Sequence, residues 1–365
     1  VCDRGLVRIP RAAATGMIAT HLETGAPDPE RVAHTVRAAL SKTGAATANG
    51  VLLFLTPHYA SQALSALRAA AQTSQCLQVS GCVAPSIMTD SAISQNQPAC
   101  AAMVFTGPWS FQTASQDGCD CWLGQAGPGQ AAFSGARLSA PGGPDYPVWR
   151  AGRIEPSQRL CLNLPFMRKQ GLIAQGAQAL TAPLPVKESY GQDLAALGNE
   201  RALPMLAREL PMEWRHLPDI PISRLAAGVV LGDPQDAIRE GRYRLLPIQG
   251  TNAVTQTVTL PEILPEGSWL FWAHIHPAQT ERNLRQQLAS LRETGPSPLF
   301  GLALSSRLRS HALPDQSSRD WGMLRDAWPG LPMIGLQCES VLGETQGQAA
   351  IEYPFALGFT LFGHP

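Results

Sequence analysis

The chain has 365 residues with 28 Lys and Arg against 28 Asp and Glu, so its formal net charge is zero. Nucleic-acid binding through a strongly basic surface and electrostatic capture by anionic lipid are therefore disfavoured, and no apolar run reaches the roughly 18–20 residues of a membrane-spanning helix. A hydrophobic fraction of 44% is enough for a sizeable core, and the low charged fraction of 15% favours either self-association or a stable protein partner.

The first third of the chain alternates between helical and strand patterns. Residues 29–42 predict a helix, because Val32, Val36 and Leu40 recur at helical spacing and Asp28 is a suitable N-cap. A second helix is predicted over residues 61–71, strands over 51–55, 77–82 and 101–105, an irregular lead-in over 1–16, and Gly- and Pro-rich loops or hairpins over 106–150.

The second half repeats this style after a strand-like run at 172–179 and a break at Thr181. Helices are predicted over residues 202–210, 277–293 and 320–328, and strands over 226–231, 242–249, 254–260, 268–275, 299–305, 332–337 and 351–362. The succession of strand 51–55, a helix and strand 77–82 is echoed by strand 299–304, a helix and strand 333–338. This echo is either an internal duplication or the ordinary alternation of α/β chains.

These patterns predict an α/β or α+β fold with β-sheets covered by helices and two related units. The first unit is placed over residues 17–180 and the second over residues 181–365. Eight cysteines in 365 residues are too few for a disulfide scaffold, which favours buried thiols in a reducing, cytoplasmic setting. Cys119 and Cys121 are either a metal or redox pair on one side of a strand or two ordinary loop cysteines.

Three histidines are candidate ligands for a metal or haem. His274 and His276 are expected on one face of a strand, roughly 6–7 Å apart, where they either hold a metal or form a polar face beside Trp272. His58 follows strand 51–55 and is either a ligand or an incidental residue at the start of a helix.

Cys82 and Cys338 end the two matching strands, which is a usual place for pocket residues. They either line one cleft between the halves or are two small buried hydrophobic residues. Arg307 either receives an anionic ligand or is an ordinary surface arginine. Thiol chemistry at either cysteine would make the chain an enzyme. Nucleotide-binding, serine-hydrolase and zinc-protease motifs are absent from the sequence, which disfavours an enzyme without settling the point.

The order and spacing of several segments resemble the FIST (F-box and intracellular signal transduction) family over most of residues 17–363. The segments that carry the resemblance are GVLLF at 50–54, LQVSGC at 77–82, RYRLLPI at 242–248, LPEGS at 264–268, LFGLALSSR at 299–307 and PMIGL at 332–336. The chain departs from the family pattern after each Gly-Cys strand, where a Gly-Glu pair is usual and CVAPSI (82–87) and QCESV (337–341) stand instead.

The resemblance implies a sensory module with related N- and C-terminal units that binds a small ligand and signals through a protein partner. Because some members of the family bind haem, haem is a possible cofactor. The implied ligand site would lie between the halves, at Cys82 and Cys338 and the residues just after them, Ser86 and Glu339. The altered Gly-Glu positions favour an alternative, in which the chain is a non-catalytic accessory or scaffold subunit of a larger complex.

Overall fold

The computed structural model describes residues 17–113, 119–125, 132–140, 142–215, 217, 220–295, 297–343 and 350–364. The predicted lead-in, residues 1–16, lies outside these residues. Helices cover mixed β-sheets, which confirms the predicted fold class. None of the helices in the described part of the chain combines the length and hydropathy that a membrane crossing requires.

The first sheet has the strand order β1-β6-β2-β3-β10-β11, with β2 parallel to β3 and β6 antiparallel to both β1 and β2. Helix α1 starts at its predicted N-cap, where the Asp28 carboxylate accepts a hydrogen bond from the Glu30 amide at 2.9 Å. The elements are β1 (Ile18–Thr24), α1 (Pro29–Thr43), β2 (Gly50–Leu55), η1 (Pro57–Gln62), α2 (Ala63–Ser74), β3 (Val79–Val83), β6 (Ala99–Phe105), β10 (Val148–Arg150) and β11 (Arg153–Ile154).

The second sheet has the order β13-β27-β23-β24-β4-β5, and its first four strands repeat β1-β6-β2-β3 in order and direction. The recurrence predicted from the sequence is therefore present in the topology. Strand β4, from the first half of the chain, completes this sheet beside β24. The elements are β4 (Ser86–Thr89), β5 (Ile93–Gln95), β13 (Arg168–Ala174), α5 (Pro277–Thr294), β23 (Pro298–Ser306), α6 (Arg307–Ala312), α7 (Gln316–Ala327), β24 (Met333–Cys338) and β27 (Leu357–Gly363).

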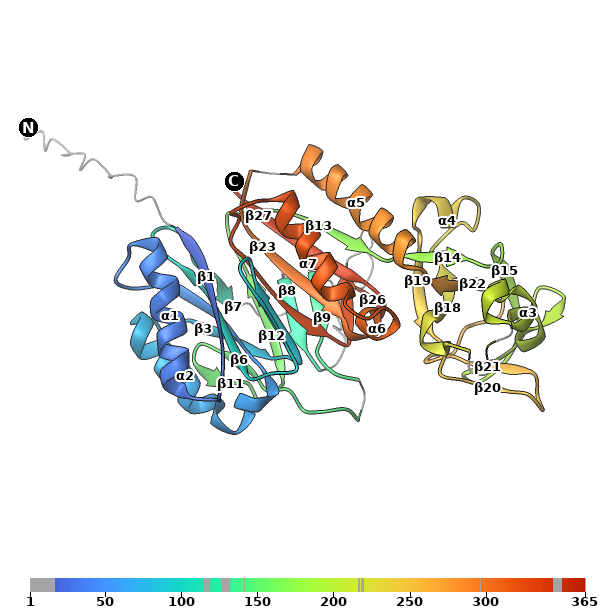
Figure 1. Cartoon of the computed structure of the whole chain (residues 1–365), viewed down its shortest axis with the longest axis horizontal. Helices are drawn as coiled ribbons and strands as arrows, with labels where there is room; N and C mark the ends of the chain where they lie inside the picture. The colour runs from blue at the N-terminus through green and yellow to red at the C-terminus, as the bar shows by residue number, and fades with distance from the viewer. Residues whose placement is uncertain are drawn as a thin grey trace, which may run out of the picture.

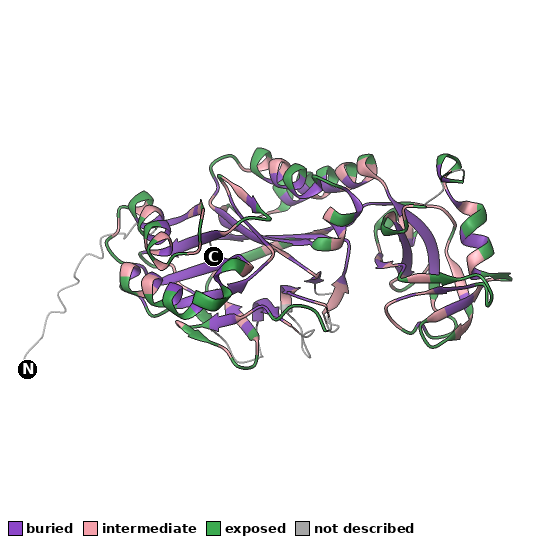
Figure 2. Cartoon of the chain, turned by 60° about the horizontal axis from the view of Figure 1, so that its bottom comes forward, coloured by how far each residue is buried: buried purple, intermediate pink, exposed green. Residues whose placement is uncertain are grey.

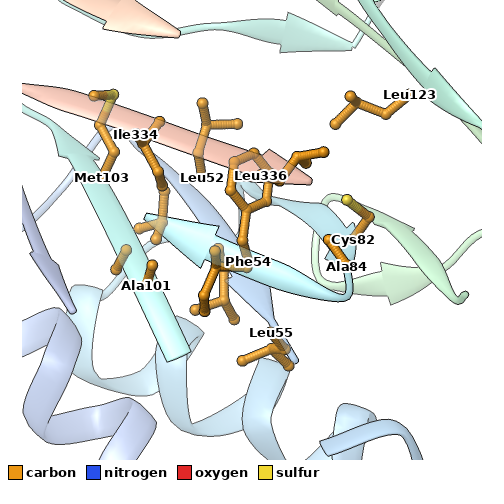
Figure 3. Packing of buried hydrophobic residues seen from close by; sticks show 14 of the residues in the cluster. Leu52, Phe54, Leu55, Cys82, Ala84, Ala101, Met103, Leu123, Ile334 and Leu336 are labelled. Carbon is orange, nitrogen blue, oxygen red and sulfur yellow. The ribbon is translucent and has the colours of Figure 1, made fainter. Parts of the chain in front are cut away.

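These two sheets pack face to face, with α1 and α2 on one outer side and α5 and α7 on the other (Figure 1). Side chains alternate along each strand, so every second residue points into the space between the sheets. Leu52, Phe54 and Met103 meet Ile334 and Leu336 there (Figure 3). The central strands β2, β6 and β27 have both faces covered and are accordingly entirely buried (Figure 2).

A third sheet, β26-β25-β9-β8-β12-β7, takes strands from both halves of the chain. Cys119 and Cys161 form a disulfide between β8 and β12. Cys121 is a free thiol in the main core, which is the hydrophobic cluster that includes Leu52 and Leu336 between the first two sheets. The closely spaced cysteines therefore form no joint site, because the partner of Cys119 lies 42 residues away. The strands are β7 (Gln112–Thr113), β8 (Cys119–Gly124), β9 (Ala132–Arg137), β12 (Arg159–Asn163), β25 (Ser340–Gly343) and β26 (Ile351–Tyr353).

Residues 177–275 form a separate body, here called the inserted domain, which lies at the right of Figure 1. Its strands form a nine-stranded antiparallel arrangement around a core of its own, which includes Trp214 and Trp272. The elements are β14 (Ala177–Ala179), β15 (Leu184–Tyr190), β16 (Asp193–Leu197), β17 (Glu200–Arg201), α3 (Ala202–Glu209), η2 (Met212–Trp214), η3 (Ile222–Arg224), β18 (Leu225–Val230), α4 (Ala237–Glu240), β19 (Tyr243–Pro247), β20 (Gly250–Asn252), β21 (Thr257–Thr259) and β22 (Trp269–Ile275).

The strand pairing divides the chain differently from the predicted units at 17–180 and 181–365. Strand β13 precedes residue 180 but belongs to the second repeat, where it pairs with β27. The inserted domain separates β13 from α5, the helix that follows in the same repeat. A break in the pattern at Thr181 marks the entry into this insertion rather than a junction between two units.

Candidate functional site

A cleft of about 590 Å³ opens at the carboxyl ends of the parallel strands β23 and β24. The turn and strand pair around β4 and β5 form one wall, and the α6–α7 segment forms the other. The crevice at the carboxyl ends of parallel strands is where α/β proteins commonly bind ligands. The lining residues are Pro85, Ser86, Gln95, Asn96, Arg307, Leu308, Ser310, His311, Asp315, Ser317 and Gln337.

The position of α6 is fixed where it leaves β23. The Ser306 hydroxyl caps the helix by accepting from the Leu308 amide at 3.2 Å, and its single proton is shared between the carbonyls of Glu339 and Pro354. Three residues further on, Arg309 turns inward and its side chain pairs with Asp320 of α7. The residues of α6 that line the cleft are thus presented from a helix that is capped at its start and paired with α7 through Arg309.

The wall of the cleft contains a chain of hydrogen bonds between α6, α7 and β24. Gln337 Nε2 donates to Ser310 Oγ at 3.0 Å, and Ser310 Oγ bonds Ser317 Oγ. On the opposite wall, Ser86 Oγ donates to the Ser94 carbonyl at 2.6 Å, so toward the cleft it acts as an acceptor. The exposed carboxylate of Asp315 adds a second acceptor. The lining as a whole suits a small polar ligand with both donors and acceptors.

Two of the predicted ligand residues, Ser86 and Arg307, line this cleft. Glu339 does not line it but lies beside Arg307, with its Oε2 3.9 Å from Arg307 Nε. An ion pair at that distance with an arginine side chain that is 49% exposed is weak. The guanidinium therefore remains available to an anionic group of a ligand.

The expectation that Cys82 and Cys338 line a cleft is wrong. Both thiols are fully buried between the two packed sheets, near Cys121, and Figure 3 shows Cys82 among the core side chains. Burial raises the pKa of Cys82 and Cys338 well above that of a free thiol, and raises the pKa of Cys121 to about 12. Since the thiolate is the reactive form, these buried thiols are inert.

The reason for this difference is the alternation of side chains along β24. Leu336 and Cys338 point into the space between the sheets, whereas Gln337, between them, lines the cleft on the helix-covered face. Sequence reasoning singled out the cysteine and passed over its neighbour Gln337. The cleft residues Ser310, His311 and Ser317 were also missed, because single polar residues on helices carry no distinctive pattern.

The three predicted histidines do not converge. His274 and His276 lie side by side as expected, with ring centroids 5.5 Å apart, but they are in the inserted domain and at the start of α5. His58 is exposed on η1, beside the first sheet. Within the described ranges, no three His, Cys, Asp or Glu side chains are grouped so as to hold a metal ion.

The cleft residues do not fit haem. The predicted ligands His58, His274 and His276 are not among them. His311 does line the cleft, but among the lining residues only Pro85 and Leu308 are apolar, and the others carry amide, hydroxyl or charged side chains. A porphyrin requires broad apolar walls in addition to an axial ligand. The arrangement accordingly favours a smaller, polar ligand.

His274 is a buried histidine, and we expect it to make the stability of the protein depend on pH. Burial, together with the nearby His276 and Arg224, lowers its pKa below the usual 6.5, and Glu213 opposes this only in part. As the pH falls below 6.5, the unfolded chain takes up a proton here more readily than the folded chain does, so stability decreases. Above that pH both states are neutral and the effect vanishes.

The expected result is a melting temperature that falls from pH 7.5 to pH 5.5 more steeply in the wild type than in His274→Gln. His58→Gln, at an exposed histidine, serves as the control and should keep the wild-type slope. Equal slopes in wild type and His274→Gln would show that His274 does not remain neutral in the folded state.

Comparison with known proteins leaves the chain without an assigned family. No protein-family model matches it, and no curated protein matches it either. The function of the chain is therefore inferred from the chemistry of the cleft.

Proposed function

We propose that this chain binds a small polar ligand in the cleft at the carboxyl ends of β23 and β24 and acts as a sensory protein of FIST type through a protein partner. The observation that carries the proposal is the joint construction of the cleft. Ser86 and Gln95 come from the first half of the chain, and Arg307, Ser310 and Gln337 from the second. A ligand that spans the cleft would bridge two segments that lie far apart in the sequence and are brought together on the second sheet, where β4 pairs with β24.

Arg307 is the residue expected to set the preference for an anionic group on the ligand. A melting-temperature screen with the twenty amino acids, small di- and tricarboxylic acids and inorganic phosphate would identify compounds that bind. We expect Arg307→Ala to weaken binding of the best compound by about tenfold to a hundredfold, because a charge-assisted hydrogen bond is worth about 1.5–3 kcal/mol.

Arg68→Ala, at an exposed arginine on α2, is the matched control and should bind as the wild type does. Titration calorimetry of the three proteins with the same compound gives the comparison. Equal affinity of Arg307→Ala and wild type would remove Arg307 from the site, and a screen without any binding compound would contradict the proposed ligand class.

An accessory or scaffold subunit is the second candidate function, and one observation favours it. Among the described residues, eight of the thirteen large hydrophobic residues that are exposed lie in the inserted domain: Tyr190, Met212, Leu217, Ile220, Ile222, Val254, Ile263 and Trp269. Four of them, Met212, Leu217, Ile220 and Ile222, lie close together in the sequence, and exposed apolar residues that form a patch are typical of partner surfaces. Purification with a partner at fixed stoichiometry would support this function, and a monomer without partners would count against it.

A cytoplasmic location is part of the proposal. Five of the seven described cysteines are free and buried, as expected in a reducing compartment. The disulfide between Cys119 and Cys161 counts against a cytoplasmic location, since disulfides persist mainly in oxidising compartments.

A further inference from the structure

The inserted domain packs against the remainder of the protein through a buried apolar contact. Ala312 and Leu313, at the end of α6, and Phe355 pack against Tyr243 and Phe271 of the inserted domain. This contact is distinct from the domain's own core, which includes Trp214 and Trp272. The end of α6 is therefore part of the surface on which the inserted domain docks.

A second contact fixes the edge strand β19 of the inserted domain. The side chain of Gln175, which lies outside this domain, donates to the Tyr243 carbonyl at 2.7 Å and accepts from the Leu245 amide at 3.0 Å. Because this amide pairs with a side chain outside the domain, its protection from exchange reports docking rather than the folding of the inserted domain.

The chain passes between the two bodies at Gly176, where there is no room for a side chain. A Cβ at this position would lie 2.3 Å from Thr280 Cα in α5, and Thr280 Oγ1 donates to the Gly176 carbonyl at 3.0 Å. The connection is thus close-packed, and the inserted domain is held in one arrangement by Gln175, by Gly176 and by the end of α6.

Helix α6 contacts the cleft and the inserted domain at the same time. Arg307, Ser310 and His311 line the cleft, and Ala312 packs against the inserted domain. Leu308 belongs to both sets. The helix has only six residues, so a displacement of its cleft-facing residues moves the others with it.

We propose that α6 couples occupancy of the cleft to the docking of the inserted domain, which makes this domain the regulated output of the protein. This inference rests on the proposed ligand-binding function for its biological meaning. A ligand that contacts Arg307, Ser310 or His311 shifts α6, and the shift loosens or tightens the contact at Ala312 and Leu313. The coupling itself is mechanical and can be measured without any ligand.

The test compares two variants that place the same bulky side chain into the cleft from opposite walls. Ser310→Trp fills it from α6, and Gln95→Trp fills it from β5, which belongs to the second sheet. Hydrogen exchange is followed at the Leu245 amide by NMR. We expect exchange at Leu245 to accelerate by about tenfold or more in Ser310→Trp and by less than about twofold in Gln95→Trp.

Two other amides separate loss of docking from loss of folding. The Leu260 amide donates to the Gln192 carbonyl within the inserted domain, and the Thr56 amide donates to the Ala99 carbonyl in the first sheet. Both should exchange as in the wild type in both variants. If Ser310→Trp accelerates exchange at either of these amides, the comparison is made with Ser310→Ala instead. That variant removes the hydrogen bonds to Gln337 and Ser317 without adding bulk.

Unchanged exchange at Leu245 in the Ser310 variant, or equal acceleration in the variants of both walls, would overturn the coupling. These outcomes are distinct from a failure of the proposed function. Binding of a screened compound that is lost in Arg307→Ala, with unchanged exchange at Leu245, would leave the ligand site in place and remove only the role of α6.

Discussion

Replacing Arg309 by Met is expected to lower the free energy of unfolding by about 3–5 kcal/mol. Arg309 and Asp320 are each 2% exposed, and the guanidinium pairs with the carboxylate at 2.6 and 3.1 Å. Removing the cation leaves a buried carboxylate whose remaining described partner is the Gln316 amide at 2.8 Å. An uncompensated buried charge is among the most destabilising changes a protein can undergo.

Chemical denaturation followed by circular dichroism measures this loss. Arg319→Met is the matched control on the same helix as Asp320, since Arg319 is 54% exposed and lies 3.5 Å from Glu281. Arg319→Met should lower the free energy of unfolding by less than about 1 kcal/mol. The double variant Arg309→Met/Asp320→Leu should recover much of the stability, because it leaves no unpaired charge. Equal losses in Arg309→Met and Arg319→Met would contradict the buried pair.

The second large effect is expected at Phe300. We expect Phe300→Ala to lower the free energy of unfolding by about 3–5 kcal/mol. The Phe300 ring stacks on Phe362 with centroids 4.6 Å apart and meets the edge of Phe105 at 5.3 Å. Phe362 is in the second sheet and Phe105 in the first, so the ring joins the two sheets across the main core. Its removal leaves a cavity between two sheets that cannot collapse without moving their strands.

The control for this substitution is Phe166→Ala, because the Phe166 side chain is 85% exposed. A surface truncation of this kind should change stability by no more than about 0.5 kcal/mol. Denaturation midpoints of the two variants, measured under the same conditions, give the comparison. A loss at Phe300 as small as that at Phe166 would show that the sheets are not packed as described.

Local patterns predicted the repeated parts of the fold well. The apolar runs around Leu52 and Leu302 are central strands, each parallel to the next predicted strand, because a fully covered strand must be apolar on both faces. The inserted domain was not predicted as a separate body. Its strands have the same periodicity as the others, and their pairing partners depend on contacts distant in sequence. The pairing of β4 with β24 in the second sheet could not be predicted for the same reason.

The candidate site was predicted in part. Ser86 and Arg307 were expected near a ligand and both line the cleft. Arg307 does so because it follows the parallel strand β23, whereas Ser86 reaches the cleft through β4, which pairs with β24. Cys338 was expected there and is instead in the core, since it lies one residue from Gln337 and faces the other side of β24. The sequence shows which residues are in a strand but not which of its two faces carries the cleft.

The central claim is that the cleft between β4–β5 and α6–α7 is a ligand site. A crystal structure of the full chain with the compound that raises the melting temperature most tests this claim directly. Our account predicts electron density for the compound between the two walls, in contact with Arg307 and with the Gln337–Ser310 hydrogen-bonded pair. Density for the compound at any other place, with the cleft filled only by solvent, would contradict it.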